Sequence, residues 1–258
     1  MTALDAFSTQ ALLAGAGAIL FAALLRGFTG FGFALASVPL ATLMLPPRAV
    51  VPAILLIQAA IGLHDCVVEF RNADWRVVGG LVAGSLFGTP LGVLALAALP
   101  QPTVRLVLGV VVMAAVIATW RPRKATTPAH LPRHRTRLAL LAGFASGVCN
   151  GVAAMAGPPA ILYFMHFEPR HTVMRSSLMV FFPIASTIAL PMVFFSGLLG
   201  WPSVALALGG LPLMMLGGWI GAIGFRRFGG STYRPAAGAA LLVTAVVAIA
   251  KGAADMGG

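Results

Sequence analysis

The sequence predicts an all-α, polytopic membrane protein built from two similar halves, and three observations lead to this prediction. The mean hydropathy is +0.97 and 59% of the residues are hydrophobic, while only 9% are charged. Soluble domains carry about 25% charged residues. The apolar residues form long runs separated by short polar loops, as transmembrane helices do. The runs also follow the same order on both sides of a polar linker, which indicates an internal repeat.

The first half, residues 1–120, opens with an apolar segment that is too long for one crossing. It covers residues 12–45 and contains the run Arg26-Gly27-Phe28-Thr29-Gly30-Phe31-Gly32. One continuous helix of this length would reach roughly 50 Å, whereas the hydrocarbon core measures about 30 Å. The glycines therefore predict a break. Three further apolar runs follow, at roughly 49–68, 77–99 and 104–120.

The second half, residues 138–258, repeats this order after a basic linker at 121–137 that is rich in Pro, Thr, His and Arg. Its broken segment covers residues 138–164, and the predicted interruption is Ser146-Gly147-Val148-Cys149-Asn150-Gly151. Runs at roughly 176–199, 203–224 and 235–250 complete the half. Short matches support the repeat: Gly88-x-x-x-Gly92 recurs as Gly217-x-x-x-Gly221, and Gly27 and Pro39 align with Gly147 and Pro159.

Each broken segment is either one tilted, discontinuous crossing or a re-entrant hairpin, and the distribution of positive charge separates the two readings. With eight crossings, nine Lys and Arg fall on one face and seven on the other. With two hairpins and six full crossings, one face collects thirteen and the other three, Arg48, Arg105 and Lys251. We therefore expect inverted repeats with a cytoplasmic linker. The thirteen are Arg71, Arg76, Arg170, Arg175, Arg226, Arg227, Arg234 and the six basic residues of the linker.

Several function classes are excluded by composition. The formal net charge is +11, but the basic residues lie in short loops between apolar runs, so we expect no nucleic-acid partner. The two cysteines, Cys66 and Cys149, both lie in apolar runs, which argues against a disulfide framework or a Cys-rich metal site. We expect no cofactor. The chain contains no His-Glu-x-x-His and no Gly-x-Ser-x-Gly motif, and only six acidic residues. We expect no enzymatic activity.

The two breaks predict a substrate site. Irregular backbone at membrane depth is tolerated only where it lines a cavity or is buried in protein, and matched interruptions mark transporter sites. A helix that starts after a break offers free N–H groups and a positive dipole end, and Arg26 adds a charge. This combination suits an oxyanion. The predicted substrate-binding residues are Arg26, Gly27, Thr29, Gly30, Gly32, Ser146, Gly147, Cys149, Asn150 and Gly151.

Alternatives stay open for some of these residues. Glycines in membrane helices also allow close helix packing, and a long Arg side chain can extend to the interface. His64 and Asp65 are candidates for carrying a coupling proton, because ionisable groups inside a membrane often do so. Both lie near the end of their run, where an interfacial position would also explain them.

Short motifs follow one another in order along both halves: Gly27-Phe-Thr-Gly30-Phe-Gly32, Val38-Pro39-Leu40, Pro47-Arg48-Ala49-Val50, Gly143-x-x-x-Gly147, Asn150-Gly151, Gly157-Pro158-Pro159 and Arg175-Ser176-Ser177. Their order resembles the sulfite exporter TauE/SafE family, also called the 4-toluene sulfonate uptake permease family. The resemblance covers nearly the whole chain and implies secondary transport of small, frequently sulfur-containing anions such as sulfite, sulfonates or sulfoacetate. Both breaks depart from the glycine-richest form of the family pattern, so the substrate does not carry over.

We therefore expect a multi-pass transporter of a bacterial inner membrane that moves a small anion by alternating access. Its partners would be the anion, the lipid bilayer and a coupling proton or sodium ion, and a homo-oligomer is compatible with the sequence. An anion channel would use the same architecture. A membrane assembly or accessory protein that transports nothing is the second alternative.

Overall fold

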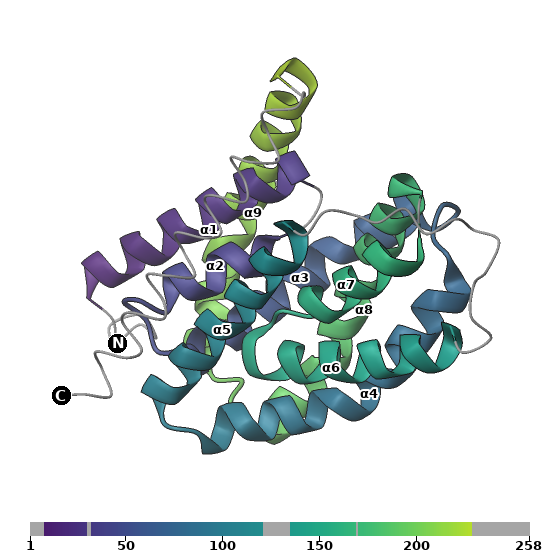
Figure 1. The fold of residues 1–258 in the computed structure, drawn as a ribbon. Helices are drawn as coiled ribbons and strands as arrows, with labels where there is room; N and C mark the ends of the chain where they lie inside the picture. The colour runs from purple at the N-terminus through teal and green to yellow at the C-terminus, as the bar shows by residue number, and fades with distance from the viewer. Residues whose placement is uncertain (1–7, 30–31, 121–134, 169, 229–258) are drawn as a thin grey trace.

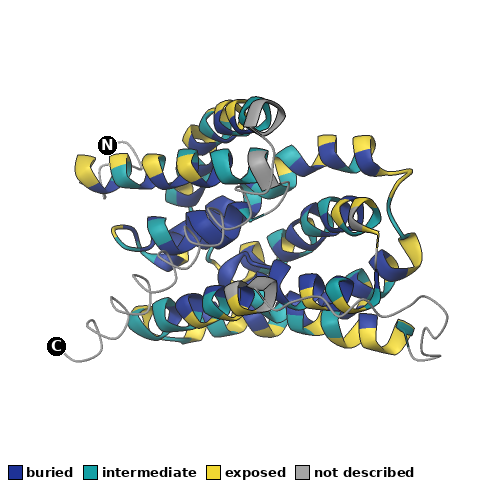
Figure 2. Ribbon diagram, turned by 45° about the horizontal axis from the view of Figure 1, so that its top comes forward, coloured by how far each residue is buried: buried dark blue, intermediate teal, exposed yellow. Residues whose placement is uncertain are grey.

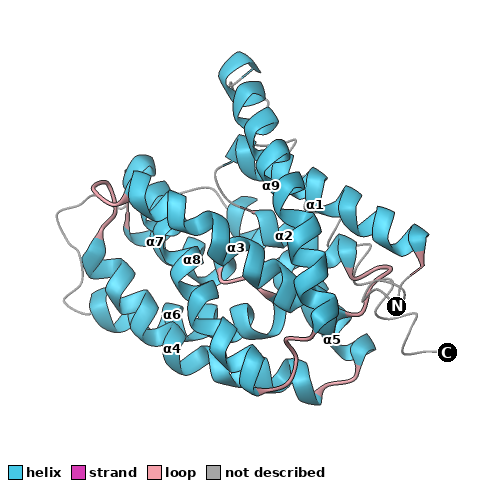
Figure 3. Cartoon of the chain, turned by 180° about the vertical axis from the view of Figure 1, so that it is seen from behind, coloured by secondary structure: helices cyan, strands magenta, loops and turns pink. Residues whose placement is uncertain are grey.

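The computed structural model describes residues 8–29, 32–120, 135–168 and 170–228. Within these ranges every regular element is an α-helix, and the connections are short (Figures 1 and 3). The linker residues 121–134 and the predicted last run at 235–250 lie outside the described residues. The helices are α1 (Thr9–Thr29), α2 (Phe33–Ala41), α3 (Pro47–Glu69), α4 (Trp75–Ala98), α5 (Gln101–Trp120), α6 (Arg135–Ala153), α7 (Gly157–Phe167), α8 (His171–Phe195) and α9 (Trp201–Phe228).

The surface of the helices is that of a membrane protein. Six described helices, α1, α3, α4, α6, α8 and α9, are long and apolar enough to cross a bilayer. Large apolar side chains point outward from them, including Phe195 at 84% exposure and Val67 at 79%. Figure 2 shows exposed positions alternating with buried ones along the outer helices. Soluble proteins rarely expose so much apolar surface. The predicted fold class, an all-α polytopic membrane protein, is confirmed.

Both broken segments are interrupted, but the second break lies later than the sequence predicted. α1 ends at Thr29 and α2 begins after Gly32, whose φ of 91° is a conformation that favours glycine. The prediction of a break at residues 146–151 was wrong, because α6 stays helical through them to Ala153. The chain leaves the helix at residues 154–156, where Ala154 has a φ of 54°.

Glycines in α6 pack against α4 instead of breaking the helix. An added Cβ at any of them would overlap backbone atoms of the other helix; at Gly147 it would lie 2.6 Å from the carbonyl oxygen of Ser85. Such stripes of small residues allow helix backbones to approach closely. The two facing stripes are Gly84, Gly88 and Gly92 on α4 and Gly143, Gly147 and Gly151 on α6.

The same kind of contact joins α1 to α9. A Cβ at Gly27 would overlap the backbone of α9 at Gly218, and a Cβ at Gly221 would overlap the backbone of α1 at Leu24. Figures 1 and 3 show α1 beside α9 and α4 beside α6 on two sides of the molecule. Gly27, Gly147 and Gly151 are therefore helix-packing residues.

The helix contacts repeat between the two halves. In the first half, α1, α3 and α4 correspond to α6, α8 and α9 of the second half. The contact of α1 with α9 corresponds to that of α6 with α4, and the contact of α3 with α9 corresponds to that of α8 with α4. The pairs Gly27–Gly151, Phe33–Gly157 and Pro47–His171 are all separated by the same number of residues. Gly27 therefore corresponds to Gly151 and not to Gly147, which lies one helical turn earlier.

One end of the bundle holds a network of ion pairs, which we call the charged end cluster. Nη2 of Arg135 lies 3.3 Å from Oδ2 of Asp74 and 3.4 Å from Oε2 of Glu168, and Nη1 of Arg175 lies 3.2 Å from Oε1 of Glu69. The start of α6, the α3–α4 connection and the α7–α8 connection are therefore at the same end. The cluster consists of Glu69, Asp74, Arg135, Glu168, Arg170 and Arg175.

The opposite end gathers the start and finish of the first broken segment. Gly15 of α1 lies against the Leu45 side chain that follows α2, and Nε of Arg105 donates to the carbonyl oxygen of Thr42 at 2.9 Å. Each broken segment thus begins and ends at one end of the bundle, and the two segments do so at opposite ends. These contacts favour re-entrant hairpins over tilted crossings, because tilted crossings would place Arg175 and Arg71 on opposite faces of the membrane.

The charged end cluster should make stability depend on acid. Burial alone raises the pKa of the Glu168 carboxyl, but hydrogen bonds from Arg170 and the charges of Arg170 and Arg135 outweigh it, so the pKa lies below the usual 4.5. A group with a lowered pKa stabilises the fold above its unfolded pKa, and this is lost as pH falls through the folded value.

Thermal unfolding in detergent should show this loss below about pH 4.5 in the unaltered chain. Glu168→Gln should lower the unfolding free energy at pH 7 by about 1–3 kcal/mol and flatten the acid dependence. An unchanged acid profile in Glu168→Gln would show that another carboxyl is responsible.

Candidate functional site

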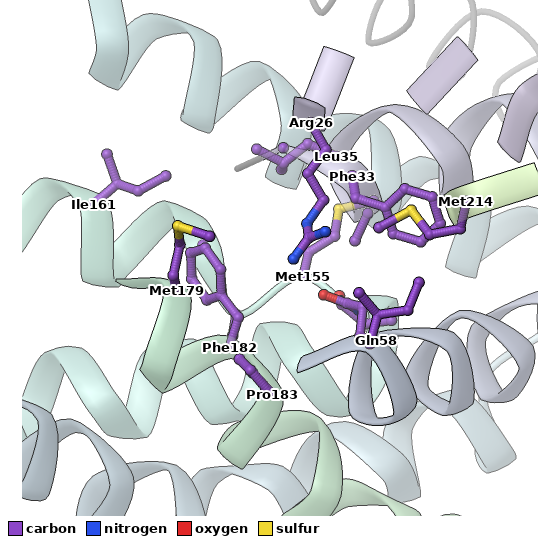
Figure 4. Close-up of a pocket in the computed structure, with 16 residues that line it drawn as sticks. Arg26, Phe33, Leu35, Gln58, Met155, Ile161, Met179, Phe182, Pro183 and Met214 are labelled. Carbon is purple, nitrogen blue, oxygen red and sulfur yellow. The ribbon is translucent and has the colours of Figure 1, made fainter. Parts of the chain in front are cut away.

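The two breaks meet at one cavity of about 40 Å³, enough for a few water molecules (Figure 4). One wall is the first turn of α2, from Gly32 to Leu35, and the facing wall is the second break, from Ala154 to Gly157. Side chains of α3, α8 and α9 close the remaining sides. Segments about 120 residues apart in the sequence therefore line one cavity.

Most of the cavity wall is apolar, and two side chains supply its polarity. Figure 4 shows the Arg26 guanidinium and the Gln58 amide extending into the same space, among Phe33, Met155 and Phe182. A largely apolar pocket with a few placed polar groups is the usual form of a small-molecule site.

Gln58 holds the second break in place. Its Nε2 donates to the carbonyl oxygen of Ala154 at 3.1 Å, which satisfies a backbone group at the point where α6 ends. Gln58 was not among the residues predicted for the site. A polar amide inside the apolar run of α3 could have indicated a functional residue. Only the fold shows that this amide contacts the second break.

Arg26 forms an ion pair with Asp65 of α3, through Nη2 and Oδ2. The Arg26 side chain is 22% exposed and that of Asp65 is 11% exposed, so both groups are largely shielded from solvent. His64 Nδ1 lies 3.8 Å from the other Asp65 oxygen, and the His64 side chain is 81% exposed. From the sequence, Arg26 and Asp65 were separate candidates; the fold brings them into contact.

Two helix N-termini border the cavity. Neither Gly32, which precedes α2, nor Ala156, which precedes α7, supplies a side-chain cap. The first-turn amides of α2 therefore remain for another acceptor. α7 starts with Gly157-Pro158-Pro159, and the prolines have no N–H to donate, so α7 contributes its dipole and few donors. Both ends carry partial positive charge.

A protein-family model described as "Sulfite exporter TauE/SafE" matches residues 15–248, which include both breaks and all the cavity residues. The chain belongs to the sulfite exporter TauE/SafE family. None of the curated proteins and none of the solved structures with which the chain was compared matches it. Membership confirms the resemblance carried by the sequence motifs. It makes the chain a membrane transporter for anions and supports the expectation that it is not an enzyme.

In this TauE/SafE chain, the predicted site residues separate into two groups. Arg26 and Gly32 line the cavity. Ser146, Cys149 and Asn150 lie within α6 and outside the cavity lining, and Nδ2 of Asn150 donates to the carbonyl oxygen of Ala185 at 2.9 Å. Gly30 and the side chain of Thr29 lie outside the described residues. In the second half, residues 154–157 line the cavity and residues 146–151 do not.

Proposed function

We propose that this TauE/SafE protein is a secondary transporter of a bacterial inner membrane that carries a small sulfonate or sulfur oxyanion, and that the cavity between the two breaks is its binding site. The observation that carries the proposal is the convergence of Arg26 and two uncapped helix N-termini on one cavity. Sulfite is the substrate that the family description names, and other sulfur oxyanions share its chemistry.

The electrostatics of the cavity suit an anion with several oxygens. The guanidinium of Arg26 offers N–H donors in a planar fork, and the α2 amides offer donors from a second direction. The apolar walls around Phe33, Met155 and Phe182 keep water away, which strengthens these charge-assisted hydrogen bonds.

The packing supports a carrier. Glycine stripes join α1 to α9 and α4 to α6 at backbone distance, so each pair is suited to move as one unit. We infer that the two halves are inverted repeats, because their broken segments open at opposite ends of the bundle and their helix contacts match. Rocking of one part of each repeat around a fixed site would give alternating access. An anion channel would need a continuous pore through the same region.

Ligand-dependent thermal stabilisation of the detergent-purified protein tests the proposal. A ligand that binds only the folded state adds about 2.7 kcal/mol at one hundred times its Kd, so a substrate should raise the melting temperature by several degrees. The panel would be sulfite, sulfate, thiosulfate, sulfoacetate, methanesulfonate and aryl sulfonates, with carboxylates and simple cations for comparison.

Liposomes that contain only this protein should then take up the stabilising anion. Stabilisation without flux would favour the accessory role, and equal stabilisation by carboxylates would remove the preference for sulfur oxyanions. Stabilisation by cations alone would contradict an anion site.

A further inference from the structure

We propose that Asp65 and the transported anion compete for Arg26, so that each singly charged anion enters the site together with one proton taken up by Asp65. This inference rests on the proposed function, because it assigns the coupling ion and the coupling residue of the same site. When the anion binds, the Asp65 carboxylate gains a proton and the Arg26–Asp65 ion pair opens. When the anion leaves, the proton is released and the pair forms again.

The geometry places Arg26 at the junction between the cavity and the carboxylate. Arg26 lines the cavity, whereas Asp65 does not. In the described residues Asp65 is the hydrogen-bond partner of the Arg26 guanidinium. An anion in the cavity and the Asp65 carboxylate therefore approach the same cation from two sides.

Charge balance inside the bilayer makes the exchange favourable. Arg26 and Asp65 together carry no net charge, so a bound monoanion would leave a net charge of −1 in a site that is largely shielded from water. Protonation of Asp65 makes the site with its bound anion neutral again, and it frees the Arg26 guanidinium to bind the anion. Because linkage is reciprocal, anion binding must then raise proton affinity as much as protons raise anion affinity.

Among the residues that the structure describes, few other charged side chains lie near this pair. On α3 itself His64 lies 3.8 Å from Asp65 but points largely into solvent, and Cys66 is the next residue. On α8 the described charged side chain is Arg175, which is paired with Glu69. α2 carries no titratable side chain, and neither does α9 between Trp201 and Gly224. On α5 Arg105 is bound to Thr42 at the far end of the bundle. Asp65 is thus the acid placed to exchange a proton here.

Proton movement with a permanently ionised anion tests the proposal. Methanesulfonate and thiosulfate do not change charge between pH 5 and 9, so any proton taken up belongs to the protein. In liposomes with a pH-sensitive dye inside, methanesulfonate entry through the unaltered protein should acidify the lumen. Its apparent affinity should fall as pH rises, by up to tenfold per pH unit, because each bound anion requires one proton.

Asp65→Asn should bind methanesulfonate with an affinity independent of pH and move it downhill without acidification. His64→Gln is the matched control and should keep the acidification. The proposal is overturned if Asp65→Asn still acidifies the lumen, if His64→Gln alone abolishes acidification, or if the unaltered protein moves anions with sodium and no proton. Where Asp65→Asn does not fold, the pH dependence of affinity in the unaltered protein decides. If the unaltered protein moves none of the anions in the panel, the proposed anion transport fails, which is a result distinct from the failure of proton coupling.

Discussion

Replacing Arg26 with alanine should lower anion binding about 10- to 100-fold and reduce transport to background. Arg26 is the described cation that lines the cavity, and hydrogen bonds to charged groups contribute about 1.5–3 kcal/mol. Binding would be measured by ligand-dependent thermal stabilisation and transport by flux into liposomes.

The alanine variant also leaves Asp65 buried without its partner, which can destabilise the fold by itself. The double variant Arg26→Ala, Asp65→Asn removes this penalty and should fold but remain inactive. Arg48→Ala is a matched control, because Arg48 bonds the Ala97 carbonyl oxygen at the end of the bundle, away from the cavity. Normal flux in the double variant would remove Arg26 from the binding site.

Adding a single methyl group at Gly88 should cause a large loss of stability. A Cβ there would overlap the carbonyl oxygen of Phe144, a backbone atom that no rotamer change can move. The helices α4 and α6 would have to separate, and such overpacking typically costs about 1–3 kcal/mol. Gly88→Ala should therefore lower the melting temperature in detergent by several degrees and reduce the yield of folded protein.

Gly79→Ala is the control on the same helix, because nothing lies within 4 Å of a Cβ at Gly79. Alanine favours a helix over glycine by up to about 1 kcal/mol, so this variant should be as stable as the unaltered protein or slightly more stable. Equal melting temperatures for the two variants would mean that the glycine stripe does not set the α4–α6 distance.

Much of the architecture follows from the sequence by itself. The apolar runs, the broken segment after Leu12 and the glycine before α2 could be read directly, because partition into a bilayer and backbone freedom depend on the residues of one segment. The distribution of Lys and Arg likewise favoured hairpins, and the contacts of Arg135 and Arg175 agree with it.

Only the tertiary structure decided what the glycines and polar residues do. Gly147 and Gly151 look, in the sequence alone, like the glycines of a helix break. In the structure they pack against α4, and α6 continues through them. Arg26 and Asp65 are 39 positions apart, and Gln58 and Ala154 are 96 apart. Because a buried polar group is stabilised by whichever partner the fold brings to it, the sequence could name Arg26 and Asp65 as candidates but could not pair them.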